Sequence, residues 1–497
     1  MRVPTVLVDA RNIDQLLPRI KSEVAAAPLL GFDIESHDAN AHEGIVEYRK
    51  KDGAKCFDYR RTTVTGFSTY CPEAAQSYYV NLGHADVENR VPWPVARQIL
   101  DARSPNCPLV IHNDPYERTV MKNSLDFDVG ETICTLQLAV SAFGPDEYDK
   151  EEFGKIMTWP FIHLLPKVIH EFQDFDKSKY EITTQQAKLL GQVVGKESTA
   201  EHSYNGFNRS IAYGYGLKQL VRNLLHEEIG GFKELLEKFG AAHMGELTGE
   251  QVADYGGDDS YFAIILLNKL LTMIRPEALA AFERQEMPMT KVYSDILIGG
   301  AHINHDEVKS QFLIEEQNHK DSMVAMRKAV EAALPFDPNP CAELAKREDW
   351  YAKNYKTYRD MITDWKRKDK KPLNLTHYMP VRTLLYDLMK LPILLEKGKV
   401  QSDGEARGQL MEKATGPALD LLRAMNGIAG IDQRIKLYLK PYKLLIDPET
   451  DKIYSNISSM LATRRMAASN TNVMQLSKDK DAAYIRGFYL PDTEDDI

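Results

Sequence analysis

The apolar residues at the start of the chain follow first a strand-like and then a helix-like spacing. Val6–Val8 is a short apolar run, and apolar residues then recur at helical spacing between Asp9 and Val24. A second apolar run covers Leu29–Ile34. Short runs are typical of buried strands, whereas a spacing of three and four is typical of a helix packed on one face. The pattern predicts strand, helix and strand over residues 3–35.

The same reasoning extends the predicted sheet towards residue 112. Thr63–Thr69 and Ser77–Leu82 are rich in β-branched and aromatic residues, which favour strands. A helix is expected over Pro94–Leu100 and a buried strand over Pro108–His112. We therefore expect a mixed α/β domain.

The length and composition are those of a protein with a sizeable core. A chain of 497 residues with 43% hydrophobic and 27% charged residues is expected to form two or three domains. No apolar run approaches a membrane span, and the first residues resemble a strand more than a signal peptide. We expect a cytoplasmic protein that does not associate with a membrane.

The cysteines and the net charge limit which compartment, metal and binding partners are expected. The five cysteines are scattered and form no Cys-x-x-Cys pair, which favours a reducing compartment and argues against zinc. The net charge is −10. A nucleic-acid-binding protein with this charge must concentrate its basic residues locally or depend on a bound metal.

The second predicted strand ends in Asp33-Ile34-Glu35. On a strand, residues i and i+2 face the same side, so Asp33 and Glu35 would present two neighbouring carboxylates. Oxygen-rich sites of this kind suit Mg²⁺ or Mn²⁺. The alternative is that Asp33 ends the strand and Glu35 is a solvated loop residue.

Two further acidic motifs follow. Glu117 is expected in the first turn of a helix that begins near Pro115, where the helix dipole favours a carboxylate whether or not it binds a metal. Tyr255 and Asp259 have the spacing of one helical face, just before a strongly apolar helix. Asp258 and Asp259 could equally be solvated acids near a helix start, although Gly256 and Gly257 suggest close packing.

In this order, the three motifs resemble those of the DEDD 3′→5′ exonucleases, and most closely the proofreading domain of family A DNA polymerases. The motifs are Asp33-x-Glu35, Asn113-x-x-Tyr116-Glu117 and Tyr255-x-x-x-Asp259. Two supporting segments, Tyr79–His84 and Tyr215–Leu220, resemble that family's strand ending in Gly-His and its Leu-Lys-x-Leu helix start. The family usually has Asp where this chain has Glu117.

The resemblance continues through the rest of the chain. It implies an RNase H-like mixed sheet flanked by helices over residues 1–275, with an insertion at about 140–210. A mostly α-helical thumb would follow over 276–450, and a short β segment that enters the palm over 451–497. Leu421–Tyr438 would be a long thumb helix, and Ile485–Phe488 a palm strand. His305-Asp306-Glu307 aligns with a helix start rather than with a polymerase site.

The resemblance implies two-metal hydrolysis of the 3′-terminal nucleotide of DNA. Asp33, Glu35 and Asp259 would be ligands of two Mg²⁺ ions, for which Mn²⁺ could substitute. Glu117 would be a ligand or would lie next to the ligands, and Tyr255 would orient the attacking water. The polymerase carboxylates of the family are not in this sequence, so we expect a second chain with the palm and fingers, as in a split bacteriophage polymerase in the host cytoplasm.

Several residues are expected to contact primer–template DNA or a single-stranded 3′ end. By resemblance Arg465 contacts the duplex near the primer end, in a segment where Arg464, Ala467 and Ala468 depart from the family. Asn113 and Asn472 lie in the matched motifs. The basic run that includes Lys366, Arg367 and Lys368 would lie along phosphates or form a solvated helix.

Three functions remain open from the sequence. The first is a proofreading exonuclease subunit of a split polymerase. The second is a primer–template clamp whose metal site is impaired by Glu117. The third is a free-standing nuclease acting on DNA or RNA.

Overall fold

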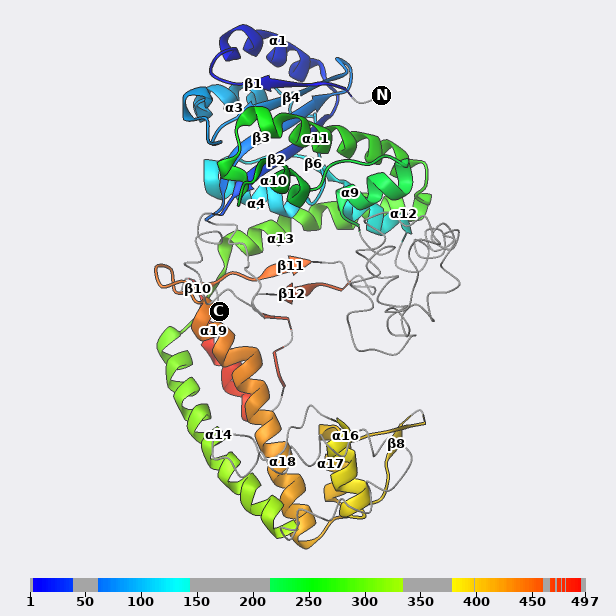
Figure 1. The fold of residues 1–497 in the computed structure, drawn as a ribbon, viewed down its shortest axis with the longest axis vertical. Helices are drawn as coiled ribbons and strands as arrows, with labels where there is room; N and C mark the ends of the chain where they lie inside the picture. The colour runs from blue at the N-terminus through cyan, green and yellow to red at the C-terminus, as the bar shows by residue number, and fades with distance from the viewer. Residues whose placement is uncertain are drawn as a thin grey trace. The chain divides into compact units, whose positions relative to one another are not determined.

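The computed structural model describes most of the chain, and it contains two compact units (Figure 1). The described residues are 3–38, 61–143, 215–333, 378–396, 398–458, 465–469, 472–474, 476–478 and 480–492. One unit comprises Met1–Gly299 and Asn456–Ala468, and the other comprises Gly300–Ser455 and Ser469–Ile497. Most of the predicted insertion at 140–210 lies outside the described residues. The three predicted domain ranges stay a prediction.

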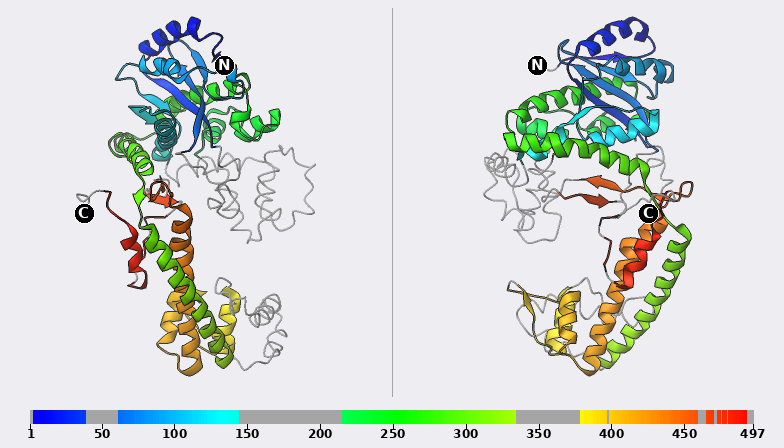
Figure 2. Two further views of the ribbon diagram at one scale, coloured as in Figure 1. Left: turned by 90° about the vertical axis from the view of Figure 1, so that its left-hand side faces the viewer. Right: turned by 180° about the vertical axis from the view of Figure 1, so that it is seen from behind.

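A six-stranded mixed sheet forms the centre of the first unit (Figure 2). Its order is β1-β4-β3-β2-β5-β6. The β2–β3 and β3–β4 pairs are antiparallel, whereas β1–β4, β2–β5 and β5–β6 are parallel. The strands are Thr5–Val8 (β1), Leu30–His37 (β2), Thr63–Cys71 (β3), Gln76–Asn81 (β4), Leu109–Ile111 (β5) and Thr132–Cys134 (β6). The mixed α/β prediction is confirmed, with β6 as an additional strand.

The side chains of β2 point alternately to the two faces of this sheet. Leu30, Phe32 and Ile34 are buried in one core with residues of the helices α1 (Ile13–Ala26) and α3 (Trp93–Asp101). Residues at the intervening positions face the long helix α11 (Gly249–Leu271), which packs across the sheet. The period of two therefore places the acidic residues of β2 against α11.

The remaining helices of the first unit surround this sheet. Helix α4 packs against α13, and the hydroxyls of Thr119 and Ser294 hydrogen bond at 2.8 Å between them. A second core joins α11 with the elements after residue 215. These helices are η2 (Val87–Asn89), α4 (Asp114–Leu125), α9 (Leu217–Leu220), η6 (Val221–Leu225), α10 (Phe232–Phe239), η7 (Met244–Glu246), α12 (Pro276–Ala281), η8 (Phe282–Glu286) and α13 (Met287–Gly299).

Two long helices form the second unit. Figures 1 and 2 show α14 (His305–Ala333) beside α18 (Gly416–Arg434). The helical path continues through η11 (Ile435–Leu439) into α19 (Lys440–Leu445), so the predicted long helix is confirmed and begins at Gly416. The predicted helix start at His305 is also confirmed. Shorter elements are α16 (Tyr378–Arg382), η10 (Thr383–Leu388) and α17 (Gly404–Met411).

In the part of the chain that the structure describes, three short strand pairs lie outside the six-stranded sheet. β7 (Ala301–His302) pairs with β10 (Lys452–Ile453), β8 (Leu395–Glu396) with β9 (Lys399–Val400), and β11 (Asn456–Ser458) lies in a two-stranded sheet with β12 (Ala467–Ser469).

The strand predicted at Ile485–Phe488 is wrong. This segment belongs to the 3₁₀ helix η12 (Lys480–Phe488). Ala482, Ile485 and Phe488 are buried at a spacing of three residues, which is the repeat of a 3₁₀ helix. Within the described residues, no helix has the length and apolar content needed to cross a membrane.

Candidate metal centre

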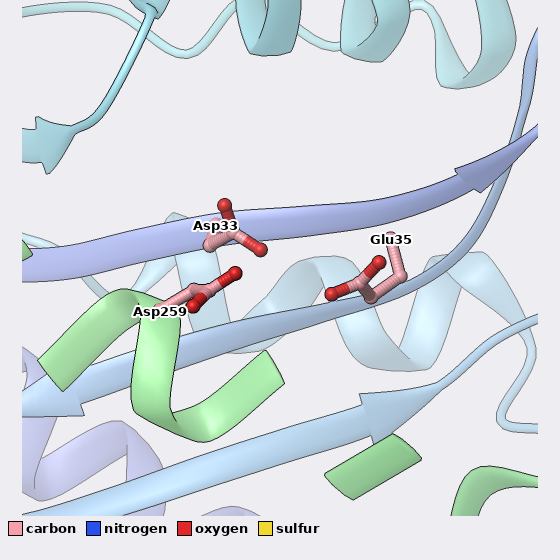
Figure 3. Close-up of side chains that lie close together, drawn as sticks. All are labelled: Asp33, Glu35 and Asp259. Carbon is pink, nitrogen blue, oxygen red and sulfur yellow. The ribbon is translucent and has the colours of Figure 1, made fainter. Parts of the chain in front are cut away.

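Three carboxylates from two elements converge beside the sheet (Figure 3). Asp33 and Glu35 come from β2, and Asp259 comes from α11. One carboxylate oxygen from each residue lies within 4.8 Å of the others. Glu35 and Asp259 are buried, and Asp33 is half-buried. The structure thus brings together three of the residues predicted to bind metal.

Alternation along β2 and the position of α11 explain this convergence. Asp33 and Glu35 lie inside the strand and share one face, so the alternative of a strand end and a solvated loop is wrong. The register against β3 shifts between Glu35 and Ser36, so the regular pairing stops directly after the second carboxylate.

The helix that carries Asp259 begins earlier than predicted. Thr248 caps α11 with its side chain, accepting a hydrogen bond from the Gln251 amide at 3.3 Å, while Gln251 accepts one from the Thr248 amide. This reciprocal cap places the helix start before Tyr255. Tyr255 and Asp259 therefore share one face within the helix, rather than preceding it.

Two glycines allow α11 to approach the sheet. A Cβ at Gly256 would lie 2.6 Å from the ring of Tyr79, and one at Gly257 would lie 2.0 Å from the hydroxyl of Thr5. The Ser68 hydroxyl also donates to the Gly256 carbonyl at 2.7 Å. The close packing expected from the two glycines is confirmed.

Burial and mutual repulsion raise the pKa values of the clustered carboxyls. For Asp33, burial is the main cause and the charge of Asp259 adds to it. For Glu35, burial again comes first, followed by Asp33 and Asp259. Burial also raises the pKa of Asp259, against the opposing effect of Lys218. The ionised cluster is costly unless a cation neutralises it.

Lys218 supplies a positive charge at this site. It lies in the short helix α9, and its ammonium forms an ion pair with Asp259. The same ammonium lies 4.3 Å from the centroid of the Tyr255 ring, on the face that Tyr255 shares with Asp259. Tyr255 is half-buried, and burial together with the nearby carboxylates raises the pKa of its phenol.

Glu117 lies in the first turn of α4, as predicted, but outside the group of three oxygens. It is buried, and its Oε2 atom has no hydrogen-bond partner within the described structure. Burial raises the pKa of Glu117, and the next cause is the charge of Asp33. A buried, unpartnered carboxylate oxygen that responds to Asp33 fits a role next to the cluster.

A histidine holds the backbone that leads to Lys218. The carbonyl of Tyr215 accepts a hydrogen bond from His112 Nε2 at 2.9 Å, so this nitrogen carries the proton. His112 Nδ1 lies 2.9 Å from the Thr135 hydroxyl. Burial lowers the pKa of His112 to about 4.

The structure describes three of the residues predicted to bind DNA. Asn113 is exposed and has a left-handed backbone with φ of 79° before α4. Arg465 is exposed, and Asn472 is half-buried and accepts a hydrogen bond from the Met474 amide at 3.3 Å. Lys366, Arg367 and Lys368 lie outside the described residues. The DNA-binding roles stay predictions.

The sequence reasoning missed the ion pair between Lys218 and Asp259. Its only signal was the Leu-Lys-x-Leu segment, which was interpreted as a helix start. The reasoning also missed the hydrogen bond of 2.6 Å between the Tyr79 hydroxyl and His84 Nε2. The His84 Nδ1 atom lies 3.3 Å from the Met244 carbonyl, so Tyr79 donates to Nε2, and burial lowers the pKa of His84 to about 4.

The residues of this centre fit a hard divalent cation. All the converging ligand atoms are carboxylate oxygens, which Mg²⁺ and Mn²⁺ prefer. A bound cation would lower the raised pKa values of these carboxyls and so favour their ionised forms. The unpartnered oxygen of Glu117 adds one more acceptor nearby.

The chain was compared with protein-family models, curated proteins and solved structures. No protein-family model matches the sequence. No curated protein matches it. Among solved structures, the chain is similar to the polymerase domain of Pol1 from M. smegmatis in complex with DNA primer-template and dNTP. The TM-score is 0.54 at 12% identity, over 98% of this chain.

The chain has a DNA polymerase-like fold. It spans 58% of the length of the Pol1 chain. At this identity the likeness concerns the fold, and it agrees with the polymerase-like architecture that the sequence motifs implied.

Proposed function

We propose that this chain is the 3′→5′ exonuclease and DNA-holding part of a family A DNA polymerase. The observation that carries the proposal is the convergence of Asp33, Glu35 and Asp259, with one oxygen of each within 4.8 Å. The polymerase-like fold supports the family. We further propose that the six-stranded sheet is the RNase H-like sheet of a DEDD exonuclease, with Asp33 and Glu35 on β2, one of its two central strands.

In this proposal the carboxylates of Asp33, Glu35 and Asp259 hold two divalent ions. Such ions would activate the attacking water and stabilise the negative charge on the phosphorus and the leaving 3′ oxygen. The Tyr255 phenol is protonated at neutral pH, as a phenol ordinarily is, and its raised pKa keeps it so, so that it can donate a hydrogen bond to that water. Glu117 is the proposed fourth carboxylate of the site, as a metal ligand or as a neighbour of the ligands.

The phosphodiester brings further negative charge to a site that is already acidic. Without divalent ions, Coulomb repulsion between the carboxylates and the phosphate would prevent binding. The proposed enzyme therefore needs metal for substrate binding as well as for hydrolysis. A frayed or single-stranded 3′ end is the proposed substrate, because a paired terminus must open before its last phosphate can enter.

We also propose that the rest of the chain holds primer–template. Arg465, Asn472 and Asn113 are the proposed DNA contacts, together with Lys366, Arg367 and Lys368. A partner chain with palm and fingers, in a split bacteriophage polymerase, would supply nucleotide addition. A structural clamp is the second candidate function, which the position of Glu117 outside the three-oxygen group favours.

A nuclease assay separates these candidates. The purified chain is incubated with a 5′-labelled primer–template that has a mismatched 3′ end, with Mg²⁺ or Mn²⁺, and with an RNA strand of the same sequence. Stepwise shortening of DNA that is lost in Asp33→Ala/Glu35→Ala supports the exonuclease. Faster cleavage of RNA favours a free-standing nuclease. Tight binding without cleavage in either metal contradicts the exonuclease and favours the clamp.

A further inference from the structure

Lys218 contacts one carboxylate of the cluster and an aromatic ring beside it. Its ammonium forms an ion pair with Asp259 and lies 4.3 Å from the ring centroid of Tyr255. Asp259 is one of the three residues whose oxygens converge within 4.8 Å. The lysine therefore uses a carboxylate that a divalent cation would also require.

The charge of Lys218 acts on the whole cluster. It lowers the pKa of Asp33, Glu35 and Asp259, in each case against the larger effect of burial. A single positive charge thus partly offsets the repulsion among three ionised groups. It does not complete the neutralisation, since three carboxylates outnumber one ammonium.

The backbone of α9 is anchored independently of this ion pair. Leu217 and Leu220 are buried in the core that α9 shares with α11. His112 holds the carbonyl of Tyr215, three residues before the lysine. The Lys218 side chain is 30% exposed. A long, flexible and partly solvated side chain on a fixed backbone can change partners without any movement of the helix.

We propose that Lys218 is the internal counter-ion of the cluster and leaves Asp259 when a divalent cation binds, so that it sets the metal affinity of the site. This inference rests on the function proposed above. The physical reason is competition, because an ammonium and a divalent cation repel each other when both lie within ion-pair distance of one carboxylate. The Tyr255 ring remains as a second partner for the displaced ammonium.

Lys218→Met tests this competition directly, because methionine keeps an unbranched side chain and removes the charge. Mn²⁺ binding is measured by isothermal titration calorimetry on the full chain. The variant is expected to bind Mn²⁺ roughly 10-fold more tightly than the wild type, since the competing charge is gone. Lys218→Arg keeps the charge and should not show this gain. Lys238→Met removes an exposed lysine of α10 and should leave the affinity unchanged.

Thermal unfolding gives a second readout that does not depend on nuclease activity. Without divalent ions, Lys218→Met should melt at a lower temperature than the wild type, because the carboxylates lose their counter-ion. Mn²⁺ should raise its melting temperature by more than it raises that of the wild type. Lys218→Gln, in which the charge is also removed, should behave in the same way.

The outcomes separate this inference from the proposed function. If the wild type binds Mn²⁺ but Lys218→Met and Lys218→Gln bind it equally or more weakly, the counter-ion role is wrong and the metal site stands. If the wild type binds no Mn²⁺ at millimolar concentration, the metal site itself is wrong and both proposals fail. Tighter binding in both neutral variants, together with the larger thermal shift, supports the inference.

Discussion

The backbone carbonyl of Ser260 lies directly against Gly31, where a Cβ would come within 2.1 Å of the carbonyl oxygen. This is a contact between the backbones of β2 and α11, so neither side can yield by rotating a side chain. Asp33 follows Gly31 by two residues, and Asp259 directly precedes Ser260. The contact therefore sets the distance across which these two carboxylates meet.

Gly31→Ala should separate the strand from the helix. We expect a loss of about 2–3 kcal/mol in the free energy of unfolding, since overpacking of a tight core typically costs ~1–3 kcal/mol. Mn²⁺ binding should weaken as well. Gly230→Ala is the matched control, because a Cβ there meets nothing within 4 Å. Equal stability of the two variants in urea denaturation would show that β2 and α11 are not in close contact.

Glu117 should contribute to metal binding through its charge. Glu117→Gln is expected to weaken Mn²⁺ binding by about 10-fold, which corresponds to ~1.4 kcal/mol, whereas Glu117→Asp should retain most of it. Without metal, Glu117→Gln should stabilise the fold, because it removes a buried carboxylate that repels Asp33. Calorimetry compares these variants with Glu131→Gln, an exposed acid. Wild-type Mn²⁺ affinity in Glu117→Gln would exclude this residue from the centre.

The half-buried His112, which hydrogen bonds to the backbone that leads into α9, should make the protein less stable in acid. Burial lowers the pKa of His112 to about 4, below the value of ~6.5 in an unfolded chain. Between these values the unfolded chain binds a proton that the folded chain does not. The free energy of unfolding should therefore fall as the pH drops from about 6.5 towards about 4.

His112→Gln should reduce this loss, because the side chain no longer titrates. His84, whose pKa is also about 4, contributes equally to wild type and variant. The measurement is urea unfolding at pH 7 and pH 5, with the exposed His226→Asn as the control. A difference between the two pH values that is as large in His112→Gln as in the wild type would contradict the assignment.

A buried ion pair should stabilise the second unit. Arg434 donates to both carboxylate oxygens of Glu315, at 2.6 and 3.0 Å, and the Tyr484 hydroxyl donates to the same Oε1 at 3.0 Å. Arg434→Met leaves a buried carboxylate without its cation, and we expect a loss of roughly 3 kcal/mol. Scanning calorimetry measures this loss of stability. Arg423→Met, which changes an exposed arginine of the same helix, is the control.

The double variant Glu315→Leu/Arg434→Met should recover part of that stability, because it removes the unpaired charge as well. The recovery should be incomplete, since the Tyr484 hydroxyl then loses its acceptor. If Arg434→Met has the same melting temperature as the wild type, the ion pair contributes nothing measurable to the stability of this unit.

Much of the fold could be predicted from patterns among residues that are close together in the sequence. The strands were predictable from short apolar runs and from their β-branched and aromatic residues. The shared face of Asp33 and Glu35 follows from the period of two along a strand. The helix starts near Pro115 and at His305 follow from the residue types of a first helical turn. These features depend on neighbours in the sequence.

The missed features depend on contacts between distant residues. The ion pair between Lys218 and Asp259 joins residues 41 positions apart, and no spacing rule relates them. The start of α11 at Gly249 depends on the reciprocal cap between Thr248 and Gln251, which lies ahead of the apolar run. The strand at Ile485–Phe488 was expected from the resemblance alone. The segment is instead part of a 3₁₀ helix, in which every third residue is buried.

Release of the 3′-terminal nucleotide from a DNA strand labelled at both ends tests the central claim most directly. The comparison is between the wild type, Asp259→Asn, and Asp254→Asn, which changes an exposed acid of the same helix. We predict that in Mg²⁺ the 3′ label is released first as a mononucleotide while the 5′ label stays on the long product. Asp259→Asn should lose this activity, and Asp254→Asn should keep it. Absence of release in both Mg²⁺ and Mn²⁺, or equal rates in all three proteins, would contradict the proposed exonuclease.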